Sequence, residues 1–362
     1  MYKLKDFAQD ISVAIKDAQS SPFDRFVGLE HYDSGEPVIT RYTDKSLLSS
    51  SVKEFRKNDI LIARRNVYLK RAGIAFFDGL TSGDSIVLRI YDDCESRTGI
   101  SKQDAIRIIP FILNSNVFWA YANKHADGMN SKRIAKEMLY DYEFDLPPLA
   151  EQKVLADKLW AAYRLKESYK KLLTATEEMV KSQFIEMFKG CKMIPLKKVA
   201  CFSKASINPI EGVKYTLYSF PAFDNNCIPE IVDGGDIKSS KLKLEENVIL
   251  YNKLNVRLSR VWNINELSSN NNVCSSEFLP IKVVNKDLIT KSFLYRILCS
   301  EDVTKKMVAC STGTSNSQKR ISPASLLSLN IPIPPMEEQM KFVAIAKQAD
   351  KSGSVLQYMI AC

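Results

Sequence analysis

The chain has 362 residues, enough for about two domains of ordinary size. Its content of 45% hydrophobic and 26% charged residues is that of a globular protein, and Gly and Pro are too few for a collagen-like or low-complexity chain. The net charge of +9 indicates an anionic partner, of which nucleic acid is the commonest.

Targeting and membrane segments are not expected. Residues 1–6 lack the apolar run of a signal peptide, and the longest uncharged stretch, residues 108–123, is too short and too polar to span a bilayer. The eight cysteines contain no Cys-x-x-Cys pair, so we expect reduced thiols in a cytoplasmic protein. With His31 and His125 as the only histidines, we expect no zinc site and no cofactor.

Apolar runs rich in Val, Ile and Leu predict short strands in two regions of the chain. These runs lie at residues 26–29, 60–63, 74–77, 85–90, 216–220, 248–251 and 279–284. Longer apolar segments predict a helix over residues 106–123 and another over residues 290–309. Segments rich in Gly, Asn and Ser predict loops at residues 128–131 and 313–317.

Two connector segments follow these regions, and each begins with a Pro-Pro pair. In the first, apolar residues recur every three or four positions from Leu155 to Phe188, which predicts about 38 helical residues and a rod of ~55 Å. The second is shorter, and Ser352-Gly353-Ser354 predicts a break or kink. The shared entry motif favours an antiparallel pair over two separate core helices.

The two regions are copies of one another. The segment from Asn58 to Val67 aligns without a gap with the segment from Asn247 to Val256. Further matches keep the same order: 4–8 with 196–200, 82–88 with 275–281, 132–134 with 319–321, and 146–152 with 333–339. The repeat predicts a first lobe at residues 1–146, a first connector at 147–190, a second lobe at 191–333 and a second connector at 334–362.

The excess charge lies at corresponding places in this repeat. Residues 53–71 contain seven bases and two acids, and residues 238–260 contain six bases and two acids. The rest of the chain is therefore close to neutral. One such window is most simply a solvated surface, but two matching windows predict two equivalent anion-binding surfaces.

The repeated phrases Leu146-Pro147-Pro148-Leu149-Ala150-Glu151-Gln152 and Ile333-Pro334-Pro335-Met336-Glu337-Glu338-Gln339 resemble those of the specificity (S) subunit of type I restriction–modification systems. The segments 26–35 and 331–335 are also similar to that family. The resemblance covers nearly the whole chain. It implies an α+β fold, with two similar mixed α/β target-recognition domains joined by long antiparallel coiled-coil helices in a pseudo-twofold repeat.

The resemblance also implies a function and partners. Each lobe would read one half of a bipartite site in double-stranded DNA, and the helices would set the gap between the half-sites. The helices would also dock methyltransferase subunits, two in number, on which restriction and translocase subunits assemble. The second connector is shorter than this arrangement requires, so the helical pair is either incomplete or completed by another chain.

The basic windows supply the candidate DNA contacts, to phosphates or to base edges. In the first lobe the candidates are Arg64, Arg65, Tyr68, Lys70 and Arg71, and in the second they are Lys253, Arg257 and Arg260. Secondary candidates, which could equally cap helices or pair with local acids, are Lys132, Arg133, Lys319 and Arg320. Arg64-Arg65 corresponds to Lys253-Leu254, so we expect the two lobes to read different bases.

Motifs of an autonomous DNA enzyme are absent from the sequence. It has no Asn-Pro-Pro-aromatic motif for adenine methylation, no glycine-rich loop for a methyl donor and no ATP-binding GxxxxGK[ST]. We therefore expect a non-catalytic recognition subunit. A DNA enzyme with an unfamiliar site, or a scaffold that binds only protein, remain the alternatives.

Overall fold

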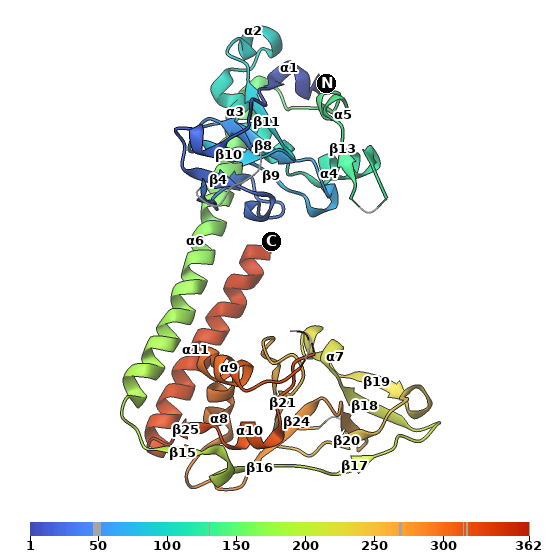
Figure 1. The fold of residues 1–362 in the computed structure, drawn as a ribbon, viewed down its shortest axis with the longest axis vertical. Coiled ribbons are helices and arrows are strands. Elements are labelled where there is room, and N and C mark those ends of the chain that lie inside the picture. The colour runs from blue at the N-terminus through green and yellow to red at the C-terminus, as the bar shows by residue number, and fades with distance from the viewer. Residues whose placement is uncertain (46–51, 130, 268–269, 314, 316–317, 362) are drawn as a thin grey trace. The chain divides into compact units, whose positions relative to one another are not determined.

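The computed structural model describes residues 1–45, 52–129, 131–267, 270–313, 315 and 318–361 (Figure 1). The chain divides into two compact units, Met1–Glu167 and Ser168–Cys362. Helix α6 (Leu149–Phe188) runs from the first unit into the second, and α11 (Met336–Ala361) belongs to the second.

The first lobe contains two five-stranded sheets and two small two-stranded ones. Its strands are β1 (Tyr2–Lys3), β2 (Ala8–Asp10), β3 (Ala14–Ile15), β4 (Arg25–Val27), β5 (Val38–Ile39), β6 (Thr43–Asp44), β7 (Val52–Phe55), β8 (Ile60–Ala63), β9 (Ala72–Ala75), β10 (Gly79–Ser82), β11 (Ser85–Ile90), β12 (Ala126–Asp127), β13 (Arg133–Ile134) and β14 (Glu143–Phe144). Its helices are α1 (Leu4–Phe7), α2 (Cys94–Thr98), α3 (Lys102–Ile112), α4 (Asn116–Lys124) and α5 (Lys136–Tyr140).

The second lobe contains a five-stranded, a four-stranded and a two-stranded sheet. Its strands are β15 (Met193–Pro195), β16 (Ala200–Phe202), β17 (Ser206–Ile207), β18 (Lys214–Tyr218), β19 (Glu230–Asp233), β20 (Lys241–Lys243), β21 (Val248–Asn252), β22 (Val261–Ile264), β23 (Asn272–Cys274), β24 (Phe278–Val283) and β25 (Asn330–Pro332). Its helices are α7 (Phe220–Asp224), α8 (Lys291–Leu298), α9 (Glu301–Ala309) and α10 (Pro323–Leu327).

The strand order of one lobe repeats in the other. The antiparallel series β2-β11-β8-β9 corresponds to β16-β24-β21-β22. The series β3-β7-β10-β4-β6 corresponds to β17-β20-β23-β18-β19, and each contains one parallel pair, β10 with β4 and β23 with β18. The predicted repeat of a mixed α/β lobe is confirmed.

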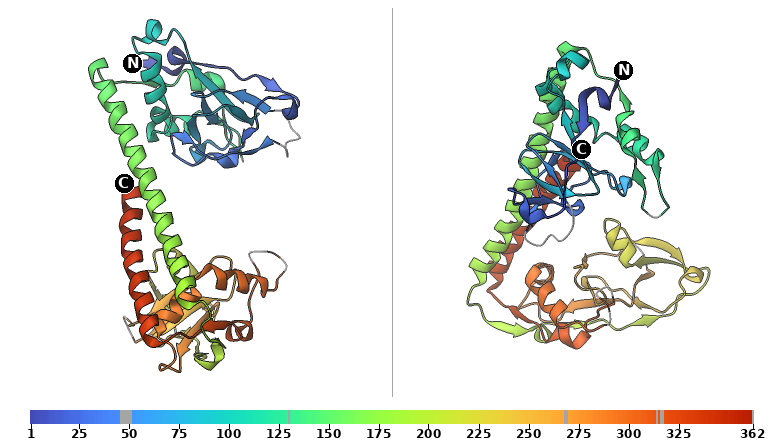
Figure 2. Two further views of the ribbon diagram at one scale, coloured as in Figure 1. Left: turned by 90° about the vertical axis from the view of Figure 1, so that its left-hand side faces the viewer. Right: turned by 45° about the horizontal axis from the view of Figure 1, so that its top comes forward.

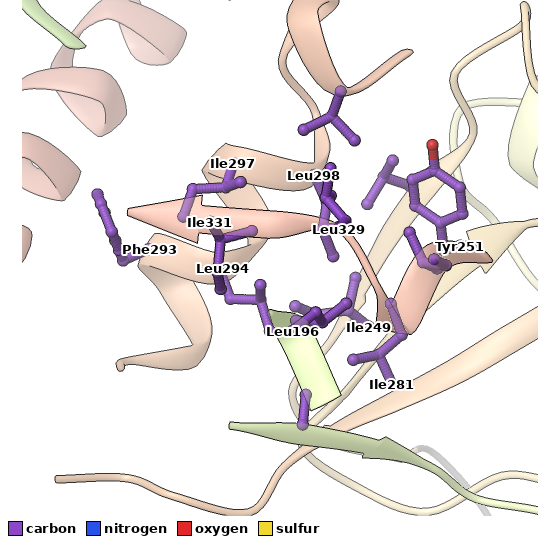
Figure 3. Close-up of a cluster of buried hydrophobic side chains, with 14 of the residues drawn as sticks. Leu196, Ile249, Tyr251, Ile281, Phe293, Leu294, Ile297, Leu298, Leu329 and Ile331 are labelled. Carbon is purple, nitrogen blue, oxygen red and sulfur yellow. The ribbon is translucent and has the colours of Figure 1, made fainter. Parts of the chain in front are cut away.

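Strands β8 and β21 are central because both of their faces are covered. Ile60 and Ile62 pack into one hydrophobic cluster of the first lobe, whereas Leu61 packs into another. In β21, Ile249 and Tyr251 belong to the cluster that Figure 3 shows, together with Leu294 of α8 and Ile331 of β25. A strand buried on both faces has a continuous apolar sequence, which is why both strands could be predicted.

The two predicted lobe helices are wrong in one respect, because each is a pair of helices. Residues 106–123 fall in α3 and α4, and the hydroxyl of Ser115 accepts a hydrogen bond from the Phe118 amide at 3.1 Å to begin α4. Residues 290–309 fall in α8 and α9, and the Ser300 hydroxyl accepts from the Val303 amide in the same way. A serine N-cap starts a new helix despite the continuous apolar pattern. The predicted loops at 128–131 and 313–317 lie partly outside the described residues.

Helix α11 packs against the second half of α6 in an antiparallel arrangement (Figure 2). The ring of Phe184 meets that of Phe342 near the start of α11, with 5.3 Å between centroids. Nearer the other end of α11, Gly353 faces Leu173. The expected antiparallel pair is therefore present within the second unit, and its aromatic contacts continue into the lobe through Phe293.

The expected break at Ser352-Gly353-Ser354 is wrong. Helix α11 is continuous over 26 residues. Gly353 is buried against α6, so tertiary packing offsets the low helix propensity of glycine. The Ser354 hydroxyl donates to the Asp350 carbonyl one turn earlier and points along the helix.

The glutamine side chain of each repeated Pro-Pro motif hydrogen-bonds the first turn of a long helix to the segment that precedes the helix. The buried Gln152 side chain donates to the Pro147 carbonyl at 2.9 Å, and the buried Gln339 side chain donates to the Pro334 carbonyl at 2.9 Å. Gln339 also donates to the Leu288 carbonyl and accepts from the Thr290 amide. These bonds give the motif a structural role at the start of α6 and α11.

Substitution of Gly353 tests the packing of α6 with α11. A Cβ atom at Gly353 would lie 3.4 Å from Leu173 Cδ1, an ordinary contact, so Gly353→Ala is expected to raise the free energy of unfolding by ~0.5–1 kcal/mol. Gly353→Leu is expected to lower it by ~1–3 kcal/mol through overpacking. Urea denaturation measures both changes, and equal effects of Ala and Leu would contradict this packing.

Candidate nucleic-acid interface

The first group of predicted basic residues lies in the turn that follows β8. Asn66 in this turn has a φ angle of 54°, in the left-handed region that asparagine tolerates better than most residues. Asn255, which follows β21 in the second lobe, has a φ angle of 53°. The same turn is therefore built at the same place in both lobes, by the same residue type.

A backbone bridge joins this turn to a second segment far along the chain. In the first lobe the Asn66 amide donates to the Lys132 carbonyl at 2.7 Å, and the Ile134 amide donates to the Arg64 carbonyl at 3.0 Å. Arg65 and Arg133 are thus antiparallel bridge partners. The bridge brings the secondary candidates Lys132 and Arg133 beside Arg64 and Arg65.

The second lobe repeats the bridge. The Asn255 amide donates to the Lys319 carbonyl at 2.8 Å, and the Ile321 amide donates to the Lys253 carbonyl at 2.9 Å. Leu254 and Arg320 are the bridge partners here. Lys253, Lys319 and Arg320 are therefore brought together as their counterparts are.

One carboxylate lies within each group of bases. Asp84 lies between β10 and β11, with its oxygens 3.4 Å from Arg133 Nη2, 3.7 Å from Arg65 Nη1 and 3.9 Å from Arg64 Nε. In the second lobe, Arg320 Nη2 donates to Glu277 Oε1 at 2.9 Å. We call Arg64, Arg65, Lys132, Arg133 and Asp84 the first basic cluster, and Lys253, Lys319, Arg320 and Glu277 the second basic cluster.

The remaining first-lobe candidates flank the first basic cluster. Tyr68 is 57% exposed, and the Lys70 amine donates to Asn116 Oδ1 at 2.9 Å. Arg71 donates to the carbonyls of Leu29 and Arg65 at 3.0 and 2.9 Å, and burial lowers the pKa of its guanidinium. Arg71 therefore supports the turn that carries Arg65, and two of its donors are already used.

The remaining second-lobe candidates differ from one another. Arg257 is exposed and donates to Asn255 Oδ1 at 2.9 Å. Arg260 forms a two-bond fork with the Asp224 carboxylate, at 2.8 and 2.7 Å, over the ring of Phe220. Its side chain is only 13% exposed, so Arg260 stabilises the lobe through a fork that is already occupied.

The sequence prediction did not single out the acids Asp84 and Glu277. Their signal was present, because Ser82-Gly83-Asp84 aligns with Ser275-Ser276-Glu277 in the repeat. The basic window at residues 53–71 also contains bases whose side chains contact other parts of the lobe. The Lys53 amine donates to the Ser85 carbonyl at 2.6 Å, and the Arg56 guanidinium lies 4.3 Å from the centre of the Phe23 ring.

Residues 183–356 match the family model of the type I restriction modification DNA specificity domain. The chain carries a type I restriction–modification DNA specificity domain. The resemblance seen in the repeated motifs is thereby confirmed. Proteins of this family supply DNA sequence specificity and are not catalytic, and in general they act with modification and restriction subunits.

Solved structures extend the likeness of the fold to the whole chain. One, titled as the structural basis of complex assembly and conformational transition of the type I R-M system, has a TM-score of 0.52 and 15% identity and covers 100% of this chain and 94% of its own. The type I S subunit from M. genitalium has a TM-score of 0.52 and 13% identity and covers 99% and 91%. These likenesses show the fold. No curated protein sequence matches the chain.

Within the described part of the chain, no helix is long and apolar enough to cross a membrane. The same residues contain no group of three or more His, Cys, Asp or Glu side chains arranged to hold a metal ion.

The Arg260–Asp224 fork predicts a pH-dependent stability. Hydrogen bonding to Arg260 holds the pKa of Asp224 below its usual value, so the contribution is full above ~pH 4 and is lost as the pH falls below it. Asp224→Asn is expected to lower the free energy of unfolding at pH 7 by ~1 kcal/mol, since solvent screens the half-exposed carboxylate. Urea denaturation at pH 7 and pH 3 measures the free energy of unfolding of the unaltered chain and of Asp224→Asn. A difference between the two that is as large at pH 3 as at pH 7 would contradict the charge pairing.

Proposed function

We propose that the chain is the recognition subunit of a type I restriction–modification complex and reads a bipartite site in double-stranded DNA. Each lobe contacts one half-site through its basic cluster. The chain itself performs no chemistry, and methylation is carried out by partner subunits in the cytoplasm.

The observation that carries this proposal is the repetition of the backbone bridge. In both lobes it joins a strand-end turn to a segment more than sixty residues away, and in both the joined segments are basic. Neutralising phosphates requires such a concentration of cations on one surface. The clusters differ in composition, with Arg64-Arg65 in one and Lys253-Leu254 in the other, which supports different half-site sequences.

The paired helices suit the docking of methyltransferase subunits. An apolar groove of about 590 Å³ lies between α6 and α11 in the second unit, lined by Leu172, Met179, Ile345 and neighbouring residues. Along the first turns of α6, in the first unit, lies a groove of about 530 Å³. Exposed apolar surface on helices favours a protein partner over DNA. We propose two methyltransferase subunits per chain, with restriction and translocase subunits joining this core.

A footprint of the chain together with its methyltransferase tests the bipartite site. We expect two protected blocks separated by about one turn of the DNA helix. The double variant Arg64→Ala, Lys253→Ala is expected to lose protection of both blocks. A single contiguous block, or protection unaffected by the double variant, would contradict the proposal.

A complex that binds no DNA at any salt concentration would favour a protein scaffold, and methylation by the purified chain alone would favour an autonomous enzyme.

Lys132→Ala tests whether the first basic cluster lies on phosphates. Lys132 is exposed, and its loss is expected to weaken binding to all sequences and to reduce the slope of log K against log salt by ~1. Lys102→Ala removes one lysine from the same lobe, where it pairs with Asp92 at 2.5 Å, and should leave the slope unchanged. Equal slopes for the two variants would place the DNA away from this cluster.

A further inference from the structure

Arginine–carboxylate pairs of the lobes differ in how many guanidinium donors they use. In Arg89–Asp59 and Arg260–Asp224 the guanidinium forms two hydrogen bonds of 2.7–2.8 Å with one carboxylate, so the fork is occupied. In the first basic cluster the nearest oxygens of Asp84 lie 3.4–3.9 Å from three guanidiniums. These are distances of ion pairs rather than of short hydrogen bonds, so the forks keep donors that a ligand can use.

The backbone that carries the Asp84 side chain is held by two hydrogen bonds. The Asp84 amide donates to Ser82 Oγ at 3.2 Å, and the Asp84 carbonyl accepts from the Arg64 amide at 3.1 Å. Glu277 is fixed in the same way, through Ser275 Oγ at 3.2 Å and the Lys253 amide at 2.9 Å. Each acid therefore sits on a rigid turn beside the backbone bridge, in both copies of the lobe.

The Asp84 carboxylate lies among the three guanidiniums of the first basic cluster. Three guanidiniums around one point repel one another, and a carboxylate among them lowers that repulsion while the cluster stays positive overall. Arg65 is also held by the Ser131 hydroxyl, which accepts from its Nε at 2.7 Å. Arg133 Nη2 lies 3.4 Å from Asp84, Asp127 is its cross-strand partner in the β12–β13 pair, and its side chain is 47% exposed.

The second cluster has one arginine, which contacts the acid through a single hydrogen bond. Arg320 donates through Nη2 to Glu277 at 2.9 Å, and its side chain is 57% exposed. Glu277 Oε2 is buried and, among the described residues, has no hydrogen-bond partner. The acid thus takes one end of the guanidinium, and the remaining donors are not used by this contact.

We propose that Asp84 and Glu277 are positioning residues for base readout. They hold Arg133 and Arg320 so that each guanidinium presents its donors to the two major-groove acceptors of a guanine, one in each half-site. This inference rests on the proposed function, since it concerns the same two basic clusters. It assigns to the acids a role in specificity, although they repel the phosphates of any DNA.

The test compares Asp84→Asn and Glu277→Gln with two matched controls that make the same charge change. Asp92→Asn removes the acid of the exposed Lys102–Asp92 pair, and Glu245→Gln removes the acid of the exposed Lys282–Glu245 pair. Fluorescence anisotropy of the complex with its methyltransferase measures affinity for the footprinted DNA and for the same DNA with one half-site scrambled. Each of the four variants loses one negative charge, so charge alone predicts equal or tighter binding to every sequence.

We expect the two cluster variants to lower the ratio of specific to scrambled affinity by ~10-fold or more, in the range of one lost bidentate contact. Asp84→Asn should affect one half-site and Glu277→Gln the other. The controls should leave the ratio unchanged. A ratio that is also unchanged in Asp84→Asn and Glu277→Gln would overturn the proposal, because the acids would then act only through charge.

A second pair of variants keeps the proposal testable if an acid variant does not fold. Arg133→Lys and Arg320→Lys keep the charge but lose the fork, and they should lower the same ratio at the same half-sites. Combined with the acid variants, they should cause little further loss, because both changes remove one contact. Additive losses would overturn the proposal.

If the unaltered complex protects no bipartite site, the proposed function itself fails. This outcome is distinct from a normal footprint with an unchanged ratio of specific to scrambled affinity.

Discussion

A two-bond backbone bridge at the end of a central strand brings the residues of each basic cluster together. Strand β8 is fixed because both faces are buried, so the turn that leaves it starts from a rigid position. The bonds from Asn66 and Ile134 then attach residues 132–134 to that turn. Without the bridge, Lys132 and Arg133 would have no fixed relation to Arg64 and Arg65, and the positive charge would be divided between two loops.

This constraint explains why net charge alone was a coarse guide to the surface. Charged residues in the basic windows have three different roles. Arg260 and Arg71 stabilise the lobes with donors that are already used. Lys53 donates a hydrogen bond to the Ser85 carbonyl. The residues at the bridge keep exposed donors and lie beside one carboxylate. The candidate interface is therefore smaller than the windows and includes an acid at its centre.

Much of the fold could be predicted from the sequence, because its strongest signals are local. Strands β8 and β21 carry continuous apolar runs, and the repeat keeps its order over the whole chain. Three features could not be predicted. The serine caps at Ser115 and Ser300 divide apolar runs that look continuous, and Gly353 is helical because it packs against Leu173. The contact between Asp84 and Arg133 depends on a tertiary bridge that sequence spacing does not show.

The repeat also gives the two lobes a common plan with different chemistry. The left-handed asparagine, the bridge and the acid on the turn are retained in both, whereas the residue beside Arg133 or Arg320 is Arg65 in one lobe and Leu254 in the other. A retained frame with altered side chains is what a protein needs to read two unlike half-sites with one fold.

The central claim is that the two bridged basic clusters are the surfaces that face DNA. The most direct measurement is a structure of the chain bound to its methyltransferase subunits and to the footprinted DNA. We expect Arg133 and Arg320 to lie at base edges of two separate half-sites, with Lys132 and Lys319 near phosphates. A complex in which DNA lies on faces of the lobes away from both bridges would contradict that claim.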